Sequence, residues 1–256
     1  IMQSQLRHIV SFSGGKDSTA MLLILLEKGE PVDEIVFFDT GWEFPQMYEH
    51  ITQVERYVGM PITRLKPRRD FTYWMHSRQI KARKGPLIGQ VHRIGNGWPS
   101  PMRRWCTREK IACIDRHCEN ATRYIGIASD EAHRTDGKSL STKKYEKRYP
   151  LIEWDVDEPA ALEYCYSKGF DWGGLYRHFR RVSCFCCPLQ RIGELRTLRR
   201  EFPDLWAKML EWDSKIQNNR GFRNYDTVHD LNAKFACEDM QGKLQFAEAN
   251  AAVKGR

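Results

Sequence analysis

The segment Ser11–Ser18, Ser-Phe-Ser-Gly-Gly-Lys-Asp-Ser, constrains this chain more than any other stretch of its sequence. It follows the run His8–Val10, which predicts a short buried strand. It precedes Ala20–Leu26, which is apolar on every side and predicts a buried helix. A strand, a tight Gly-Gly turn and a helix N-terminus together direct free backbone N–H groups at an anion. The segment therefore predicts an α/β fold with an anion site after its first strand.

The side chains of this loop indicate which anion it would hold. Its two glycines allow a tight turn and a close approach of a phosphate to the backbone. Its serines add hydroxyl donors, and Lys16 adds a compact positive charge. Asp17 would repel a bare phosphate, so we expect it to cap the helix or to help hold Mg²⁺. The simpler alternative is a Ser/Gly-rich turn without a ligand.

The composition bounds the class of protein. With 256 residues, 41% of them hydrophobic, the chain suffices for one large α/β domain or one domain with an appendage. No run of about 18 apolar residues and no signal peptide is found, so we expect a cytoplasmic protein without membrane association. Eight cysteines then favour metal ligands or reactive thiols over disulfides. The net charge of +8 favours a polyanionic partner, although a nucleotide alone would explain it.

Basic residues gather in two stretches. The first runs from Arg64 to Lys84 and contains one acid, Asp70; the second, Lys138–Arg148, contains only Glu146. Each predicts either a solvated surface loop or a basic flap that closes over phosphates. Aromatic residues interleave the first stretch, which is typical of surfaces on which bases stack.

Alternating strand and helix patterns predict a doubly wound, mainly parallel sheet with helices on both faces and a C-terminal Cys-containing helical appendage. Beyond the loop, strands are expected over 34–38, 62–65, 123–127 and 149–154, and helices over 45–58, 107–117, 158–168, 190–200 and 203–218. Ligands bind such sheets beyond the carboxyl ends of the strands, where the loop and Asp39–Gly41 lie. Residues 70–104 predict a long loop region. We expect two domains, an α/β domain over 1–155 and a helical region with the cysteine cluster over 156–256, packed on the first.

The cysteines form a second constellation. Cys184-x-x-Cys187 has the spacing with which two thiolates reach one metal centre, and further ligands must then come from elsewhere. Cys106 is the best candidate, because it lies at a predicted helix N-terminus, which lowers a thiol pKa. Cys186 is open to three roles: ligand, persulfide carrier or packed side chain. The centre is either zinc or an iron–sulfur cluster. The remaining cysteines are expected to be small buried hydrophobes: Cys113, Cys118, Cys165 and Cys237.

The chain resembles the phosphoadenosine phosphosulfate reductase family of the PP-loop, or adenine nucleotide α-hydrolase-like, superfamily. The similarity covers about residues 7–200, with colinear motifs at Ser13–Ser18, Phe38–Pro45, Arg104–Lys110, Gly126–Arg134, Tyr149–Trp154 and Cys184–Pro188. The resemblance implies an adenine nucleotide at the carboxyl edge of the sheet and a cysteine-ligated 4Fe–4S centre nearby. The chain departs from the family twice. The family's first Cys-Cys ligand pair is Cys106-Thr107 here, and the reductases' C-terminal Glu-Cys-Gly-Leu-His motif is absent.

The leading hypothesis is an ATP pyrophosphatase that adenylates a substrate oxygen, releases pyrophosphate and supports sulfur transfer to a nucleic acid, tRNA or DNA. Its cofactors would be ATP, Mg²⁺ and a 4Fe–4S cluster, with Zn²⁺ as the alternative to the cluster. Its partners would include a cysteine desulfurase or thioredoxin, and a homodimer is compatible with the sequence. The catalytic candidates are Lys16, Asp17 and Arg134, and the cluster candidates are Cys106, Cys184, Cys187 and Cys186.

The resemblance also assigns nucleotide-binding roles. The loop would bind the β- and γ-phosphates, and the backbone near Phe38–Thr40 would face adenine and ribose. Asp17, with Asp39 as a second candidate, would position magnesium. Arg134 and Arg104 would stabilise charge growing on the α-phosphate. The binding candidates are Ser11, Ser13, Gly14, Gly15, Lys16, Asp17, Ser18, Phe38, Asp39, Thr40, Gly126 and Arg104.

Two alternatives belong to other classes. A thioredoxin-dependent (phospho)adenylylsulfate reductase would need a nucleophilic thiol, for which only Cys186 or Cys237 is available. A zinc-stabilised nucleotide- or nucleic-acid-binding module would need no catalysis, whereas the intact Lys16-Asp17-Ser18 favours an enzyme.

Overall fold

The computed structural model of the chain describes residues 6–136, 145–217 and 219–254, with residues 242–254 described as backbone. By their internal contacts the residues form two compact units. The first comprises Ile1–Phe71 and Trp105–Phe185, and the second comprises Thr72–Arg104 and Cys186–Arg256. The first unit extends past residue 155, where the sequence predicts a domain boundary. In the second basic stretch, Lys138, Lys143 and Lys144 lie outside the described residues.

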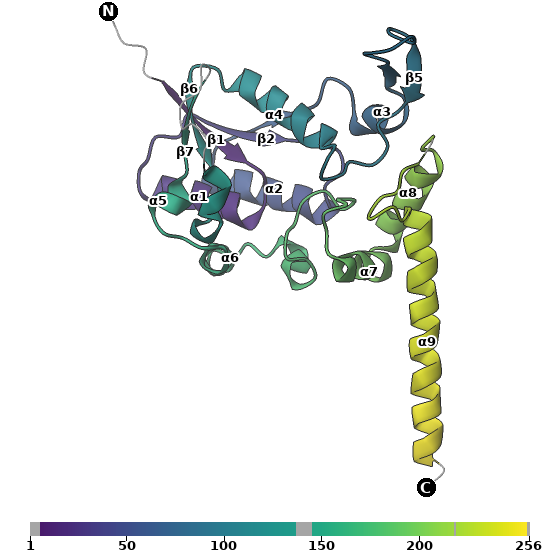
Figure 1. Cartoon of the computed structure of the whole chain (residues 1–256). Helices are drawn as coiled ribbons and strands as arrows, with labels where there is room; N and C mark the ends of the chain where they lie inside the picture. Colours follow the sequence, from purple (N-terminus) through teal and green to yellow (C-terminus); the bar gives the residue numbers. More distant parts are fainter. Residues whose placement is uncertain (1–5, 137–144, 218, 255–256) are drawn as a thin grey trace, which may run out of the picture. The chain divides into compact units, whose positions relative to one another are not determined.

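The first unit is built on a parallel sheet of five strands in the order β3-β2-β1-β6-β7 (Figure 1). The strands are β1 (Arg7–Phe12), β2 (Glu34–Phe38), β3 (Ile62–Leu65), β6 (Ala121–Ile125) and β7 (Tyr145–Arg148). The central strand β1 is flanked on both sides, so Ile9 and Val10 are fully buried, as an interior parallel strand requires. The predicted α/β sheet is thereby confirmed.

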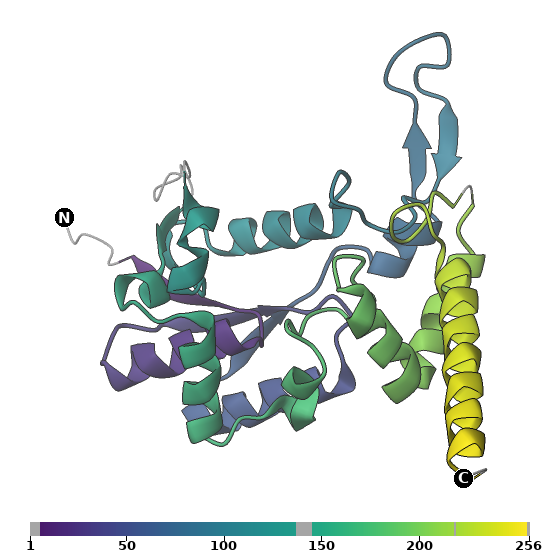
Figure 2. The same ribbon diagram turned by 60° about the horizontal axis from the view of Figure 1, so that its bottom comes forward.

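Helices cover both faces of this sheet. Figures 1 and 2 show α4 on one face and α1, α2 and α6 on the other. Their bounds are α1 (Lys16–Glu27), α2 (Pro45–Val58), α4 (Trp105–His117) and α6 (Glu158–Ser167); shorter helices are η1 (Ser129–Thr135), α5 (Pro150–Glu153) and η2 (Trp172–Arg177). Helix α1 is apolar on every side because α6 packs against it in addition to the sheet. This packing places residues of α6 close to the loop between β1 and α1.

The strand predicted over 149–154 is wrong. Strand β7 ends at Arg148, and Pro150–Glu153 forms the single turn α5. Proline has no N–H to donate to a sheet ladder, whereas its fixed φ suits the first position of a helix. The apolar residues Leu151 and Ile152 therefore pack from a helical turn.

The second unit contains helices and a hairpin. They are α3, which begins in the first unit (Phe71–His76), β4 (Gln79–Lys81), β5 (Val91–Ile94), α7 (Ile192–Glu201), α8 (Pro203–Ser214) and α9 (Val228–Lys254). The antiparallel pair β4–β5, visible as a ribbon in Figure 2, replaces part of the loop predicted over 70–104. The expected helical appendage is confirmed, and α9 carries Cys237. Within the described part of the chain, no helix has both the length and the apolar character of a membrane span.

Candidate functional site

The loop between β1 and α1 has the close-packed backbone that its glycines predict. Gly14 has φ +79°, and a Cβ there would lie 2.5 Å from Met47 Sδ. Trp172 Nε1–H donates a hydrogen bond of 2.7 Å to the Gly14 carbonyl. A Cβ on Gly126, just after β6, would lie 3.0 Å from the Ser18 backbone nitrogen. Glycine is therefore required at residue 14 by conformation and space, and at residue 126 by the close approach of the first turn of α1.

The loop's serines bond to the loop itself. Ser18 Oγ accepts the Ser13 N–H at 3.1 Å and donates to the Gly15 carbonyl at 3.0 Å. The two serine hydroxyl oxygens are 3.0 Å apart. Ser18 thus fixes the curvature of the turn, and its predicted contact with a phosphate stays a prediction.

Lys16 is the buried centre of the site. Its Nζ lies 3.0 Å from Asp17 Oδ1 and 3.2 Å from Glu158 Oε2, and its side chain is 6% exposed. Its backbone N–H donates to the Tyr176 hydroxyl at 2.8 Å. Asp17 does not cap α1, because Gly15 is the N-cap and Asp17 lies inside the first turn, so the capping option for Asp17 is wrong. The Asp17 carboxylate instead faces the lysine.

Glu158 and a further carboxylate, Glu131, also form ion pairs with nearby arginines. Glu158 lies 3.6 Å from Arg181 Nη2, and Glu131 forms ion pairs with both Arg181 and Arg134. Burial raises the pKa of Asp17, and the charges of Glu158 and Glu131 raise it further, against the opposing effect of Lys16. Burial also opposes ionisation of Glu158, but Lys16 and Arg181 bring its pKa below the ordinary value. The site therefore alternates carboxylates with cations.

This cluster contains an oxygen that suits a hard cation. Glu158 Oε1 is buried and accepts no hydrogen bond, and its charged neighbour, Arg181 Nη2, lies 3.6 Å away. Together with the Asp17 carboxylate it offers the anionic oxygen ligands that Mg²⁺ prefers. The residues present therefore fit a magnesium ion beside the loop.

The other predicted nucleotide ligands of the first unit lie at or near the same edge of the sheet. Asp39, after β2, accepts hydrogen bonds from Tyr48 Oη at 2.8 Å and from the Gly41 N–H at 2.9 Å. The side chain of Phe38 is buried, with the residue 1% exposed, so only its backbone is available to contact a nucleoside. Ser11 Oγ accepts a hydrogen bond of 3.1 Å from Arg123. Arg134, in η1, lies with Glu131, as described above, whereas Arg104 belongs to the second unit.

Two of the predicted metal ligands lie in the first unit. Cys184 Sγ lies 3.4 Å from Thr40 Oγ1 and 3.7 Å from Glu43 Oε1. Trp42 links the two cysteine segments: its ring meets that of Trp105 edge-on at 6.0 Å, and its carbonyl accepts the Phe185 N–H. Trp105 directly precedes Cys106, and Phe185 directly follows Cys184. Both cysteines are therefore next in sequence to a residue that contacts Trp42.

Cys106 lies in the first turn of α4, as predicted, but the pKa of its thiol is raised and not lowered in this structure. Burial raises the pKa of its thiol, and the lowering effects of Thr107 and Lys110 are smaller. Burial likewise raises the pKa of Glu43, against an opposing effect of Lys110. Cys186 and Cys187 belong to the second unit, where Cys186 is buried. Across the residues that the structure describes, no three His, Cys, Asp or Glu side chains form a metal-binding group.

Sequence reasoning missed several residues of the site. Glu158 and Tyr176 contact Lys16, and Trp172 bonds to Gly14, yet none of them belongs to a recognisable motif. His50 is also buried here: its Nε2 lies 3.0 Å from Thr19 Oγ1, and its ring stacks on Trp172 at 4.3 Å. These partners come from later in the chain and are brought to the loop by packing, which a local pattern does not reveal.

Comparison with known proteins identifies the family. The model of the phosphoadenosine phosphosulfate reductase domain matches residues 7–190, and the chain belongs to this family. It is 29% identical over 243 residues to an uncharacterised protein of Methanocaldococcus jannaschii, which covers 87% of this chain and 43% of that protein. The chain thus spans less than half the length of this relative.

Two characterised proteins are also similar. Adenosine 5'-phosphosulfate reductase 2 of Bacillus subtilis is 26% identical over 178 residues, 66% of this chain and 67% of the reductase. Among solved structures, the U34-tRNA thiolase of Methanococcus maripaludis with its 4Fe-4S cluster has a TM-score of 0.44 and 15% identity. That match covers 92% of this chain and 74% of the thiolase. The resemblance to the reductase family, predicted from the motifs, is confirmed.

Proposed function

We propose that this chain is an ATP pyrophosphatase of the family. In the proposed reaction an oxygen of the substrate attacks the α-phosphorus of ATP, the bond to the bridging oxygen breaks, and pyrophosphate leaves. The adenylated substrate then loses AMP when a sulfur nucleophile replaces the activated oxygen. The observation that carries this proposal is the clamping of buried Lys16 between Asp17 and Glu158 at an intact glycine loop.

Each group of the site has a role in this reaction. The backbone of the glycine loop and the N-terminus of α1 bind the leaving phosphates. Lys16 neutralises charge as pyrophosphate departs, and its fixed position avoids reorganisation during the reaction. Arg134, released from Glu131, stabilises charge on the α-phosphate. The end of β2, where Tyr48 orients Asp39, faces the nucleoside.

A magnesium ion would be held by Asp17 and Glu158, with Asp39 as a further candidate. When bound, it would supply Lewis-acid stabilisation of the phosphate oxygens. The two protein carboxylates bind and orient; neither is proposed as a proton acceptor from the substrate.

We further propose that sulfur transfer uses a cysteine-ligated centre, with a nucleic acid as the acceptor. The ligand candidates are Cys106, Cys184 and Cys187, with Cys186 as the further thiol. When bound, an iron–sulfur cluster would supply a soft site for sulfide. The net charge of +8 supports a polyanionic acceptor.

The direct test is the formation of AMP and pyrophosphate from ATP and Mg²⁺ by the pure protein, with and without bulk tRNA or sheared DNA. We expect Lys16→Ala to abolish both products. Lys28→Ala is the matched control, because Lys28 lies exposed at the opposite end of α1. Equal rates in wild type and Lys16→Ala would contradict the proposal.

A second candidate is favoured by one observation, the 26% identity with a Bacillus subtilis adenosine 5'-phosphosulfate reductase. Such an enzyme reduces adenylyl sulfate to sulfite and AMP while a thioredoxin dithiol becomes a disulfide. The discriminating assay measures sulfite from adenylyl sulfate with reduced thioredoxin. Sulfite formation that depends on Cys186 or Cys237, without pyrophosphate formation from ATP, would favour the reductase.

A further inference from the structure

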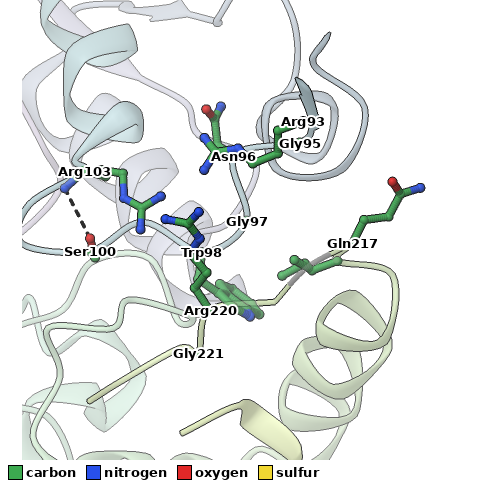
Figure 3. A pocket seen from close by; sticks show the side chains of 11 residues that line it. Arg93, Gly95, Asn96, Gly97, Trp98, Ser100, Arg103, Gln217, Arg220 and Gly221 are labelled. Atoms are coloured by element: carbon green, nitrogen blue, oxygen red, sulfur yellow. Dashed lines mark hydrogen bonds between the residues drawn. The ribbon is translucent and has the colours of Figure 1, made fainter. Parts of the chain in front are cut away.

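The second unit contains a cavity of about 60 Å³ that is lined by three arginines (Figure 3). Arg93 comes from β5, Arg103 from the segment that follows it, and Arg220 from the segment after α8. Figure 3 shows the three guanidinium groups directed toward a common space. Both walls belong to the same compact unit, so the cavity is a feature of that unit by itself.

The charges in this cavity are not balanced by the protein. Among the described residues that line it, none is acidic, and no described carboxylate forms an ion pair with any of the three arginines. Arg93 Nε is buried without a hydrogen-bond partner. Burial lowers the pKa of Arg93, and the charges of Arg103, Arg220 and Arg78 lower it further. An anion in the cavity would satisfy the free donor and remove the repulsion.

The carboxylate of Asp213, which is bonded to the lining residue Trp98, is already committed. Asp213 accepts hydrogen bonds from Trp98 Nε1–H at 2.7 Å, from Asn219 Nδ2–H at 2.7 Å and from the Val228 N–H at 3.1 Å. These bonds tie the two walls of the cavity together. Asp213 is therefore a structural support for the cavity and is not available as a counterion for the arginines.

The cavity wall is also shaped by its backbone. Gly95 has φ +70°, and a Cβ there would lie 2.2 Å from the Met75 carbonyl oxygen. The N–H groups of Gly95, Asn96 and Gly97 donate to the carbonyls of Arg78, Trp74 and Met75 respectively. Since these backbone donors are used, the guanidinium groups are the cationic donors that remain for a ligand.

We propose that this cavity binds a phosphate group of a polynucleotide backbone. Planar guanidinium groups match phosphate oxygens in pairs of hydrogen bonds, and the cavity is small enough to select a phosphate over a base. The positive charge continues beyond one anion, because residues 72–104 contain no acid and carry Arg78, Lys81, Arg83 and Lys84 in addition to the cavity arginines. A chain of phosphates would neutralise all of these basic residues, whereas a single free phosphate would neutralise only the arginines of the cavity. This inference rests on the nucleic-acid acceptor of the proposed function and names where that acceptor is held.

The test measures binding of fluorescein-labelled single-stranded RNA and DNA to the full chain by anisotropy, without ATP, over a series of KCl concentrations. The test variants are Arg93→Gln/Arg103→Gln and, in case the partly buried Arg93 affects folding, Arg103→Gln/Arg220→Gln. Arg200→Gln is the matched control, because Arg200 is exposed on α7 of the same unit. We expect the test variants to bind about tenfold more weakly, with a salt slope smaller by about 1, and the control to bind as wild type does.

The outcomes separate this inference from the proposed function. If wild type binds neither oligonucleotide, both the acceptor class and the cavity's role are wrong. If wild type binds and the test variants bind equally well, or lose no more than Arg200→Gln loses, the cavity assignment alone is wrong. Inorganic phosphate is the competitor that tests the source of the anion. If it binds through these arginines while oligonucleotide binding is unchanged in the variants, the site takes a free anion and the polynucleotide proposal fails.

Discussion

The ammonium group of Lys16 lies 3.2 Å from the carboxylate of Glu158, although the two residues are far apart in the sequence. Lys16 opens α1 and Glu158 opens α6, and the packing of these two helices brings their N-termini together. A loop lysine that is buried against two carboxylates is fixed in position before any ligand arrives. We infer that α6 is part of the active site as well as of the scaffold.

Glu158→Gln tests this role. The substitution keeps the size of the side chain but removes a charge that orients Lys16, so we expect pyrophosphate formation to fall by about tenfold or more. The control is Glu163→Gln, because Glu163 is exposed on the same helix. An unchanged rate in Glu158→Gln would show that Asp17 alone positions the lysine.

Lys16→Met separates stability from catalysis. Without the ammonium group, the carboxylates of Asp17 and Glu158 are left buried without their shared cation, which costs about 3 kcal/mol of unfolding free energy. The double variant Lys16→Met/Glu158→Gln should regain most of this stability in urea unfolding but no pyrophosphate formation. If the double variant were as unstable as the single one, the clamp would not be the cause.

The sequence predicts the loop and four of the five sheet strands, β1, β2, β3 and β6, because these are local patterns. A run such as Ile35–Phe38 can be read by itself, and the Gly-Gly turn demands a special backbone wherever it occurs. Glu158 could not be found in this way, since its contact with Lys16 exists only once α6 packs on α1. The hairpin β4–β5 was missed because its strands, of three and four residues, are largely exposed and too short for a hydrophobic pattern to stand out.

Gly14→Ala tests the need for glycine in the loop. The alanine would be strained at φ +79° and would place Cβ 2.5 Å from Met47 Sδ. We therefore expect the free energy of unfolding to fall by about 3 kcal/mol and ATP binding to be lost. Gly29→Ala is matched for backbone strain, since Gly29 has φ +66° but open space around its Cβ position. Gly29→Ala should lower the free energy of unfolding by about 1 kcal/mol and leave ATP binding intact. Equal losses in both variants would exclude a role for Met47.

His50 predicts how stability depends on pH. Burial lowers its pKa from 6.5 to about 3, so the folded chain keeps this ring neutral while the unfolded chain takes up a proton below pH 6.5. Stability is therefore lost as pH falls from 6.5 toward 3, by at most about 1.4 kcal/mol per pH unit from this group. His50→Gln should flatten the slope in this window, whereas His133→Gln, at an exposed position of the same unit, should not. An unchanged slope in His50→Gln would mean that other groups control acid unfolding.

Metal analysis of protein purified without oxygen tests the cysteine centre. A 4Fe–4S cluster predicts a brown protein with iron and sulfide in about fourfold molar amounts, whereas a structural zinc site predicts a colourless protein with about one zinc. Cys184→Ser should lose the metal in either case, because the sulfur beside Thr40 and Glu43 is a proposed ligand. Cys237→Ser is the control, since Cys237 is exposed on α9. Full metal content in Cys184→Ser would remove this thiol from the ligand set, and loss of metal in Cys237→Ser would place the C-terminal helix in it.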